Sequence, residues 1–242
     1  MSKSKSTLAR WLLGTFTVLS LSVLLTLCIL QQPKTQAASF EVRGFDVSHH
    51  QGDIAWEKIS PEQYDFVYIK ATEGAQFQDR LFKHNWQQAR QQGLRVGAYH
   101  FYRLCRSAQV QAENFIRTVP KAPNALPPVI DLEYDPQCID QFNQQQLLQQ
   151  IQLMYQALQQ HYGQAPIFYV SKNFYNIVLA GHFPHVALWV REYQGLPQLK
   201  GQPQWTFWQH SRQGQIEGIQ GPVDLNVFYG SKLMWYAFLA QQ

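Results

Sequence analysis

The chain has no excess of charge of either sign once its first 37 residues are set aside. The full sequence of 242 residues contains 20 Lys and Arg against 16 Asp and Glu. Four of the basic residues, Lys3, Lys5, Arg10 and Lys34, precede residue 38 in a segment without acids, so the remainder holds 16 residues of each sign. A formally neutral domain without a basic stripe lacks the electrostatic footprint of a nucleic-acid-binding protein. We therefore expect no nucleic-acid partner.

The sequence also lacks an internal repeat, and its one long apolar run, from Trp11 to Leu30, follows the basic N-terminus. A secretory signal usually has a shorter apolar core, and about 20 residues can also span a bilayer. The small-residue segment at 35–37 is a suitable cleavage site. Residues 1–38 are therefore expected to be a signal peptide or a membrane anchor with a short linker, and both alternatives stay open. In either case residues 39–242 form one exported domain, periplasmic or extracellular, with membrane contact only through the leader.

Cysteine is scarce, with three in the chain, and only Cys105 and Cys138 lie in the domain. Two cysteines in an exported domain suggest one disulfide, with two unpaired thiols as the alternative. Neither lies in a recognisable Cys/His signature, so catalysis by a thiolate is disfavoured.

Recognisable metal-binding motifs are absent too. Nitrogen and oxygen ligands could in principle come from Asp46, His49, His50, His100, Asp131 and Glu133. However, no HxxxH or HExxH spacing occurs, and adjacent histidines on extended chain point to opposite faces. A hydrogen-bonded histidine within the barrel is the plainer interpretation of His100. We expect no metal and no organic cofactor, and we keep a metal-dependent polysaccharide hydrolase or deacetylase as the least favoured alternative.

Strand and helix patterns alternate from residue 41 onward. Strands are expected at 41–48, 65–72, 95–102, 128–133 and 166–171, and helices at 79–93, 107–120, 141–162 and 173–181, the first of them with Asp79 as N-cap. Repeated strand–helix units imply a parallel sheet, and about eight of them can close a barrel. The last third departs from this pattern, because strands at 187–193, 206–211 and 223–228 follow without full helices between them. The predicted fold is α/β, an irregular TIM-like barrel of about eight strands with a helix-poor last third.

Carboxylates recur where the strands of such a barrel would end. Asp131 and Glu133 lie two residues apart on an apolar strand, so both side chains point the same way. Asp46 ends the first strand, Glu73 follows the second, and Asp224 lies in the last. Since the site of a parallel barrel lies at the C-terminal ends of its strands, we expect these acids to converge. Helix capping would explain a single acid, but convergent acids suggest glycoside hydrolysis, in which one donates a proton and another supports positive charge.

Aromatic residues also fall in or near the strand ends. The candidates for substrate binding are Tyr68, Tyr99, Tyr102, Tyr169, Trp189 and Trp208. A core role is the default interpretation of each ring, but together they would suit stacking on sugar rings at the mouth of the barrel.

Taken together, these segments resemble the glycoside hydrolase family 25 lysozymes, the Chalaropsis-type N-acetylmuramidases. The matching segments run in family order across almost the whole domain: GFDVSHHQGDIAW (44–56), FVYIKATEG (66–74), GLRVGAYHFY (93–102), VIDLEYD (129–135), LWVREY (188–193), TFWQHS (206–211) and GIQGPVDLNVF (218–228). The resemblance implies an eight-stranded barrel with five helices. It also implies hydrolysis of the β-1,4 bond between N-acetylmuramic acid and N-acetylglucosamine in peptidoglycan.

The resemblance further implies roles for individual residues. Glu133 matches the general acid and Asp131 its catalytic partner, while Asp46 and Asp224 match flanking acids that complete the site. The aromatics similar to site-lining residues of the family are Tyr68, Tyr99 and Trp208. The expected partner is the peptidoglycan glycan strand, and a monomer is expected because a polymer-cutting site must stay open. A non-catalytic peptidoglycan-binding barrel with the acids as remnants is the main alternative.

Cys105 and Cys138 are not part of the family signature. Each follows a predicted strand, the third and the fourth, by a few residues. Those strands should be neighbours in the barrel, so we expect a disulfide across the rim near the acids.

Overall fold

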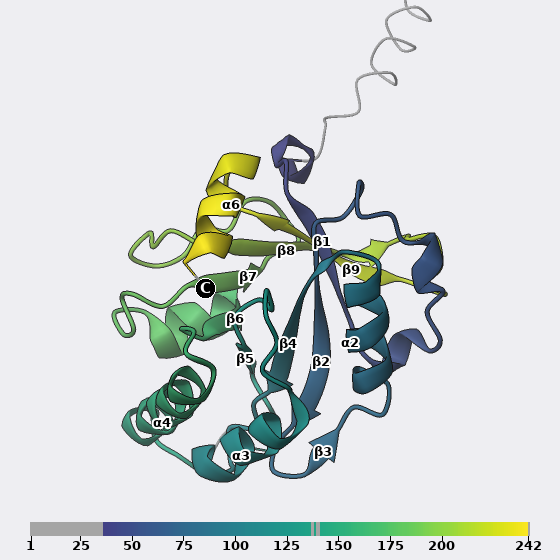
Figure 1. The fold of residues 1–242 in the computed structure, drawn as a ribbon. Helices are drawn as coiled ribbons and strands as arrows, with labels where there is room; N and C mark the ends of the chain where they lie inside the picture. Colours follow the sequence, from purple (N-terminus) through teal and green to yellow (C-terminus); the bar gives the residue numbers. More distant parts are fainter. Residues whose placement is uncertain (1–35, 137, 139–140, 242) are drawn as a thin grey trace, which may run out of the picture. The chain divides into compact units, whose positions relative to one another are not determined.

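The computed structural model describes residues 36–136, 138 and 141–241, and the chain divides after Ser39 into two compact units. Of the first unit, the described part is one short 3-10 turn, η1 (Gln36–Ser39). The second unit, Phe40–Gln242, is the barrel of Figure 1. No helix in the described part of the chain is long and apolar enough to cross a membrane, and the apolar run from Trp11 to Leu30 lies outside that part.

Eight strands close into the barrel, which confirms the predicted α/β fold. Around the barrel they are β1 (Arg43–Val47), β9 (Val223–Phe228), β8 (Phe207–Gly214), β7 (Leu188–Arg191), β6 (Ile167–Ser171), β5 (Val129–Leu132), β4 (Arg95–Phe101) and β2 (Phe66–Glu73). Closure comes from the parallel pairing of β2 with β1. A two-residue strand, β3 (Phe77–Gln78), pairs antiparallel with β2 outside this set.

The sheet is mixed, so the prediction of a parallel sheet is wrong for β9. This strand runs antiparallel to both of its neighbours, β1 and β8. It does so because residues 215–222 form a short connection without a helix, and a short connection can only reverse the chain direction. The start of β9 therefore lies beside the end of β1.

Five α-helices occur in the described part of the chain: α2 (Phe82–Gln91), α3 (Ala108–Thr118), α4 (Gln144–Tyr162), α5 (Lys172–Phe174) and α6 (Lys232–Ala240). A π-helical turn, η4 (Tyr175–Leu179), continues α5, and two 3-10 turns, η2 (His49–Gln51) and η3 (Trp56–Lys58), follow β1. The longest helix, α4, starts with a capping box between Asn143 and Gln146 and ends at Gly163 in the left-handed conformation. Only α5 and η4 lie between α4 and α6, which confirms the helix-poor last third.

The prediction that Asp79 caps the helix after β2 is wrong. Helix α2 starts after Leu81, two residues later. The Asp79 carboxylate accepts hydrogen bonds from the backbone N–H of Leu81 at 2.9 Å and of His49 at 2.9 Å. It thus joins the loop before α2 to the loop after β1.

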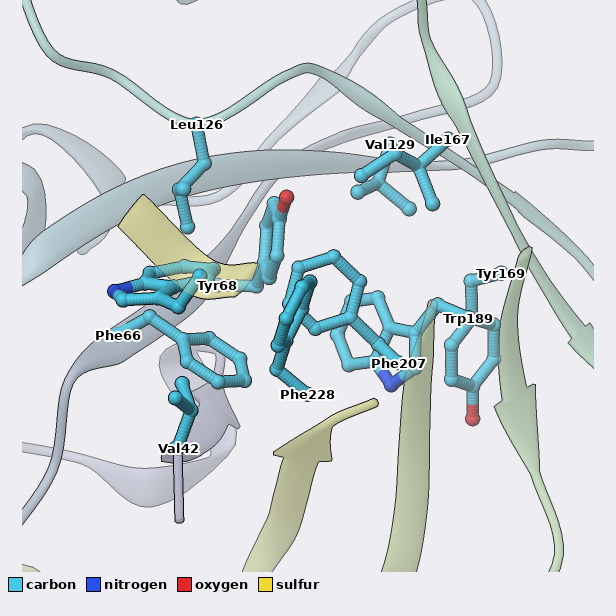
Figure 2. Close-up of a cluster of buried hydrophobic side chains, with 11 residues drawn as sticks. Val42, Phe66, Tyr68, Leu126, Val129, Ile167, Tyr169, Trp189, Phe207 and Phe228 are labelled. Carbon is cyan, nitrogen blue, oxygen red and sulfur yellow. The ribbon is translucent and has the colours of Figure 1, made fainter. Parts of the chain in front are cut away.

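Aromatic rings fill the closed end of the barrel (Figure 2). Phe66 and Tyr68 of β2 point inward at the strand period of two, and they meet Trp189 of β7 and Phe207 of β8. Ring centroids lie 5.0 Å apart for Tyr68 and Trp189, and 5.1 Å apart for Phe66 and Phe207. Gly97 on β4 makes this packing possible, because a Cβ there would lie 2.1 Å from Cε1 of Tyr68. With this end plugged, the interior of the barrel is open to a ligand from the other end.

Candidate active site

A pocket of about 210 Å³ opens at the end of the barrel opposite the aromatic plug. We call it the mouth pocket. Its lining residues are Asp46, Lys70, Tyr99, Phe101, Asp131, Glu133, Tyr169, Trp189, Arg191, Tyr193, Gln209 and Asp224. Two larger hollows, of about 440 and 400 Å³, lie elsewhere in the described part of the chain, and no carboxylate lines either. The acids therefore single out the mouth pocket as the candidate active site.

The four acids assigned to the site by sequence all line the mouth pocket. Asp131 is the next inward residue after Val129 on β5, and Glu133 follows it at the same period. Asp46 on β1 lies directly opposite Asp224 in the antiparallel pair of β1 and β9. Asp224 is the second residue of β9, so it reaches the mouth from the N-terminal end of its strand, not from the C-terminal end.

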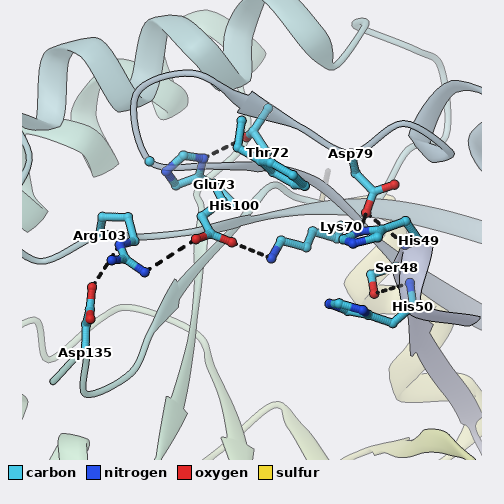
Figure 3. A network of polar contacts seen from close by, with 12 residues as sticks. Ser48, His49, His50, Lys70, Thr72, Glu73, Asp79, His100, Arg103 and Asp135 are labelled. Atoms are coloured by element: carbon cyan, nitrogen blue, oxygen red, sulfur yellow. Dashed lines mark hydrogen bonds and ion pairs between the residues drawn. The ribbon is translucent and has the colours of Figure 1, made fainter. Parts of the chain in front are cut away.

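Glu73 was expected at the same mouth, but it does not line the pocket. The strand register shifts between Lys70 and Thr72, which turns the last residues of β2. The Glu73 carboxylate instead contacts Lys70 Nζ at 2.7 Å and Arg103 at 3.5 Å (Figure 3). Glu73 therefore holds a pocket-lining lysine in place.

Asp46 lies at the centre of a buried hydrogen-bond network. Its Oδ1 accepts from the amide of Asn226 at 2.7 Å and from the amide of Gln209 at 2.9 Å. Asn226 accepts in turn from the indole N–H of Trp189 at 2.9 Å, and Gln209 accepts from the hydroxyl of Tyr169 at 2.9 Å. Because indole and phenol donate here, both amides must present their N–H groups to Asp46. The network fixes the orientation of this carboxyl within the pocket.

Burial dominates the ionisation of Asp46 and Asp131. Burial, and then the neighbouring charge of Asp224, raise the pKa of Asp46 well above its ordinary value, although the bonds from Asn226 and Gln209 act in the opposite direction. Asp131 is 6 % exposed, and its Oδ1 has no hydrogen-bond partner among the described residues. Burial and the nearby charge of Glu133 raise the pKa of Asp131 as well. In both residues burial and a neighbouring acid therefore favour the protonated form of the carboxyl group.

Glu133 has one close cationic neighbour. Arg191 Nη2 lies 2.9 Å from Glu133 Oε1. Burial raises the pKa of Glu133, and the Arg191 charge lowers it in part. Burial also raises the pKa of Asp224, again opposed chiefly by Arg191. A carboxyl with a raised pKa keeps its proton at higher pH, which is what a general acid requires.

Three of the six predicted aromatics line the mouth pocket: Tyr99, Tyr169 and Trp189. Tyr99 faces the acids from β4, and their charges, after burial, raise the pKa of its hydroxyl. Trp189 is almost fully buried, with its indole N–H bonded to Asn226. It forms the boundary between the aromatic plug and the polar mouth.

The other three predicted aromatics do not line the pocket. Tyr68 is the inward residue of β2 that precedes the pocket-lining Lys70, and it lies deeper in the barrel, within the aromatic plug. Its hydroxyl donates a hydrogen bond to the Pro127 carbonyl at 3.3 Å. Tyr102 and Trp208 have the opposite strand parity to Phe101 and Gln209, which line the pocket, so they face away from the barrel interior, and both are buried there. A position near a strand end does not determine which way the side chain points.

The histidines do not join the acids. His100 is fully buried between the Thr72 hydroxyl at 2.7 Å and Gln111 at 3.2 Å, and burial lowers its pKa to about 4. His49 Nδ1 lies 2.7 Å from Asp79 Oδ2, and its ring is tilted against that of His50, with the centroids 4.1 Å apart (Figure 3). Among the described residues, no group of three or more His, Cys, Asp or Glu side chains is arranged to hold a metal ion.

The predicted disulfide between Cys105 and Cys138 is confirmed. It joins the loop after β4 to the loop after β5, two strands that pair in parallel. Arg103 and Asp135 join the same two loops, with Nε and Oδ2 2.8 Å apart. The loop that carries Glu133 is therefore tied to its neighbour by a covalent and an ionic link.

Sequence reasoning missed several polar residues of the site: Lys70, Arg191, Tyr193, Gln209 and Asn226. The signal that could have found them is the strand period. All of them except Tyr193, which lies beyond the end of β7, are two residues along a strand from an inward aromatic or acidic residue, as Lys70 is from Tyr68 and Asn226 is from Asp224.

A closed α/β barrel with carboxyl groups of raised pKa around a pocket at its mouth is typical of a glycoside hydrolase. The family model of "Glycosyl hydrolases family 25" matches residues 45–219, and the chain belongs to this family. The resemblance drawn from the sequence is thereby confirmed.

Three similar proteins illustrate the relationship. YegX of Escherichia coli K12, an uncharacterized protein, is 37 % identical over 208 residues, which cover 84 % of this chain and 75 % of YegX. Lysozyme M1 of Streptomyces globisporus is 33 % identical over 204 residues, which cover 78 % of this chain and 68 % of that protein. The solved structure of a family 25 glycosyl hydrolase from Bacillus anthracis has a TM-score of 0.77 at 37 % identity, over 82 % of this chain and 93 % of that one.

Proposed function

We propose that this glycoside hydrolase is a lysozyme that cuts the β-1,4 bond between N-acetylmuramic acid and N-acetylglucosamine in peptidoglycan. The observation that carries the proposal is the set of four carboxyl groups around one pocket of the family 25 barrel. Burying carboxyl groups costs folding free energy. Binding a neutral sugar chain does not require a protonated acid, so the set favours catalysis over a barrel that only binds.

Glu133 is the proposed general acid. Its raised pKa keeps a proton available, and the proton passes to the glycosidic oxygen as the bond breaks. Arg191 moderates that pKa in the free enzyme. A sugar that enters the pocket displaces water around Glu133, which favours the protonated form further.

Asp131 is the proposed catalytic partner. Its buried, unpartnered Oδ1 lies in the same pocket and is free to face the positive charge that develops on the reacting sugar. Asp46 and Asp224 complete the site on the opposite wall, with Asp46 oriented by Asn226 and Gln209. Tyr99, Tyr169 and Trp189 are the proposed sugar contacts.

The leader places this activity outside the cytoplasm. Residues 1–38 direct export, and the run from Trp11 to Leu30, long enough for a bilayer, is retained as a membrane anchor. Residues 39–242 act on glycan strands as a monomeric domain. The disulfide supports export, because such bonds persist in oxidising compartments.

The test is a digest of purified peptidoglycan, followed by identification of the new reducing ends by mass spectrometry. Muramic acid at those ends is the expected result. Glucosamine or anhydromuramic ends would refute the proposed bond and chemistry while leaving a wall-cutting enzyme. Binding without cleavage on several wall types would establish the non-catalytic barrel instead.

A further inference from the structure

The outer face of α6 is unusually apolar for a helix on the surface of a domain. Its exposed residues are Leu233, Met234, Tyr236, Ala237 and Ala240. Leu233 is 78 % exposed and Tyr236 is 62 % exposed. No charged residue occurs from Leu233 to the end of the chain. A helix in contact with water on one side normally carries polar residues there. An exposed apolar face of this kind is typical of a site that binds an apolar surface.

The residues on the inner face of α6 pack against the barrel and add nothing to the exposed apolar surface. Trp235 is buried against the aromatic plug, with ring centroids 5.2 Å from Phe228 and 5.5 Å from Phe66. Phe238 packs beside it against the same cluster. The Ser231 hydroxyl caps the first turn by accepting from the Met234 N–H at 3.3 Å. Helix α6 is therefore firmly packed on the barrel, and the side chains on its outer face project into the solvent.

The start of the barrel domain lies next to α6. Glu41 Oε2 accepts a hydrogen bond from the backbone N–H of Lys232 at 2.8 Å, and the Val42 carbonyl accepts from Phe228 N–H at 3.0 Å. Along the chain, Glu41 follows Leu30, the last residue of the apolar run, by eleven positions. A fully extended segment of that length reaches at most about 40 Å. If the leader is held in a bilayer, Glu41 and the start of α6 beside it thus stay within about 40 Å of that bilayer.

The mouth pocket lies at the other end of the barrel. Strand β1 runs from Arg43, near α6, to Asp46, which lines the pocket. Figure 1 shows the same arrangement, with α6 near the start of β1 and β3 near the opposite end. A surface that docks on α6 would leave the mouth open.

We infer that the outer face of α6 lies on the lipid surface of the membrane that holds residues 11–30, and that this contact points the mouth pocket away from the membrane toward the wall. Leu233 and Met234 enter the boundary between headgroups and acyl chains, and Tyr236 lies at headgroup depth, as amphipathic rings do at interfaces. The inference rests on the proposed retention of the leader as an anchor, and it is independent of which glycosidic bond is cut.

The test places a fluorophore at either end of the barrel of the full chain. The NBD label is attached to a single new thiol, Tyr236→Cys on α6 or Gln76→Cys in the exposed turn after β2, each in a Cys28→Ser background. The protein is reconstituted into vesicles of equal parts phosphatidylethanolamine and phosphatidylglycerol, with and without spin-labelled lipid. We expect several-fold stronger quenching by the spin-labelled lipid at position 236 than at position 76. Leu233→Glu should remove most of the quenching at 236, whereas Ile177→Glu, at another highly exposed apolar residue, on η4, should leave it unchanged.

Three results would overturn the inference, and they are distinguishable. A chain that does not float with the vesicles after a carbonate wash would refute the anchor and, with it, the contact. A chain that floats, but whose label at 236 is quenched no more than the label at 76, would refute the contact alone. A label at 236 shielded from water without vesicles, together with a dimer in solution, would identify a second copy of the chain as the partner. Muramidase activity on peptidoglycan, measured on the same samples, tests the proposed function separately.

Discussion

Replacing Asn226 with Ala removes both hydrogen bonds that join Asp46 to Trp189. Asn226 is 1 % exposed, so water cannot easily replace it. The indole N–H of Trp189 would be left unpaired in the interior, at a cost of about 1–3 kcal/mol. A hydrogen bond to a carboxylate contributes about 1.5–3 kcal/mol, but Asp46 keeps its bond from Gln209 and can take up a proton, so only part of that is lost. We expect the free energy of unfolding to fall by about 3 kcal/mol in total.

The assay is thermal and urea unfolding of the variant beside the unmodified protein. For a domain of this size, a loss of 3 kcal/mol lowers Tm by roughly 6–12 °C. Asn176→Ala is the matched control, because Asn176 makes one bond at the surface, to the backbone N–H of Lys200 at 2.8 Å. That change should alter stability by about 0.5 kcal/mol or less. Since the Asn226 bond lowers the pKa of Asp46, its loss should also move the acidic limb of the activity profile to higher pH.

A double-mutant cycle with Trp189→Phe separates the two bonds. Phe lacks the indole N–H, so Asn226→Ala should cost less in that background than in the unmodified protein. The reasoning is refuted if Asn226→Ala destabilises the domain no more than Asn176→Ala does. It is also refuted if the cost is the same in the Trp189→Phe background.

Further predictions concern the ionisation of the site and the loop link beside it. Arg191→Gln removes the charge that lowers the pKa of Glu133, so the alkaline limb of kcat/KM against pH should move to higher pH; an unmoved limb, or one moved to lower pH, would contradict the assigned pair. Asp131→Asn should lower kcat by about 100-fold or more. The same variant should be more resistant to urea at neutral pH. A carboxyl group whose pKa is raised by folding contributes stability at low pH, and this stability is lost as the pH rises from the unfolded pKa through the folded pKa. A variant that is less stable at neutral pH would be evidence against burial as the cause of the raised pKa of Asp131. Cys105→Ser with Cys138→Ser opens a link across 33 residues and should reduce the free energy of unfolding by about 3–4 kcal/mol in urea, and an unchanged urea midpoint would argue against a structural role.

The four acids that line the mouth pocket could be found from the sequence because each is marked by its local sequence context. Asp131 and Glu133 stand out as charges in an apolar strand, and Asp46 and Asp224 lie in segments that match a known family. The side chains that orient them, such as Asn226 and Gln209, are ordinary polar residues whose function depends on which strands meet. Which strands meet depends in turn on the antiparallel direction of β9, and the alternation of strands and helices in the sequence did not reveal this direction.

The aromatic residues illustrate a different limit. Nearness to a strand end placed Tyr68, Tyr102 and Trp208 at the mouth, whereas depth and parity place them in the plug or outside the barrel. Only the true register distinguishes these positions. Helix α6 was missed for a related reason, because a segment that is apolar on all sides has no stripe to mark it as a helix. Its outer face can be interpreted only after the inner one is known.

The most direct test of the account compares Glu133→Gln with Glu73→Gln in the release of muramic reducing ends from purified peptidoglycan. Both acids lie near the mouth of the barrel, but only Glu133 lines the pocket. If Glu133 supplies the proton, Glu133→Gln should lower the rate by about 10²–10⁴-fold, while Glu73→Gln keeps most of the activity. A Glu133→Gln variant that releases muramic ends at nearly the normal rate, with normal folding, would contradict the central claim.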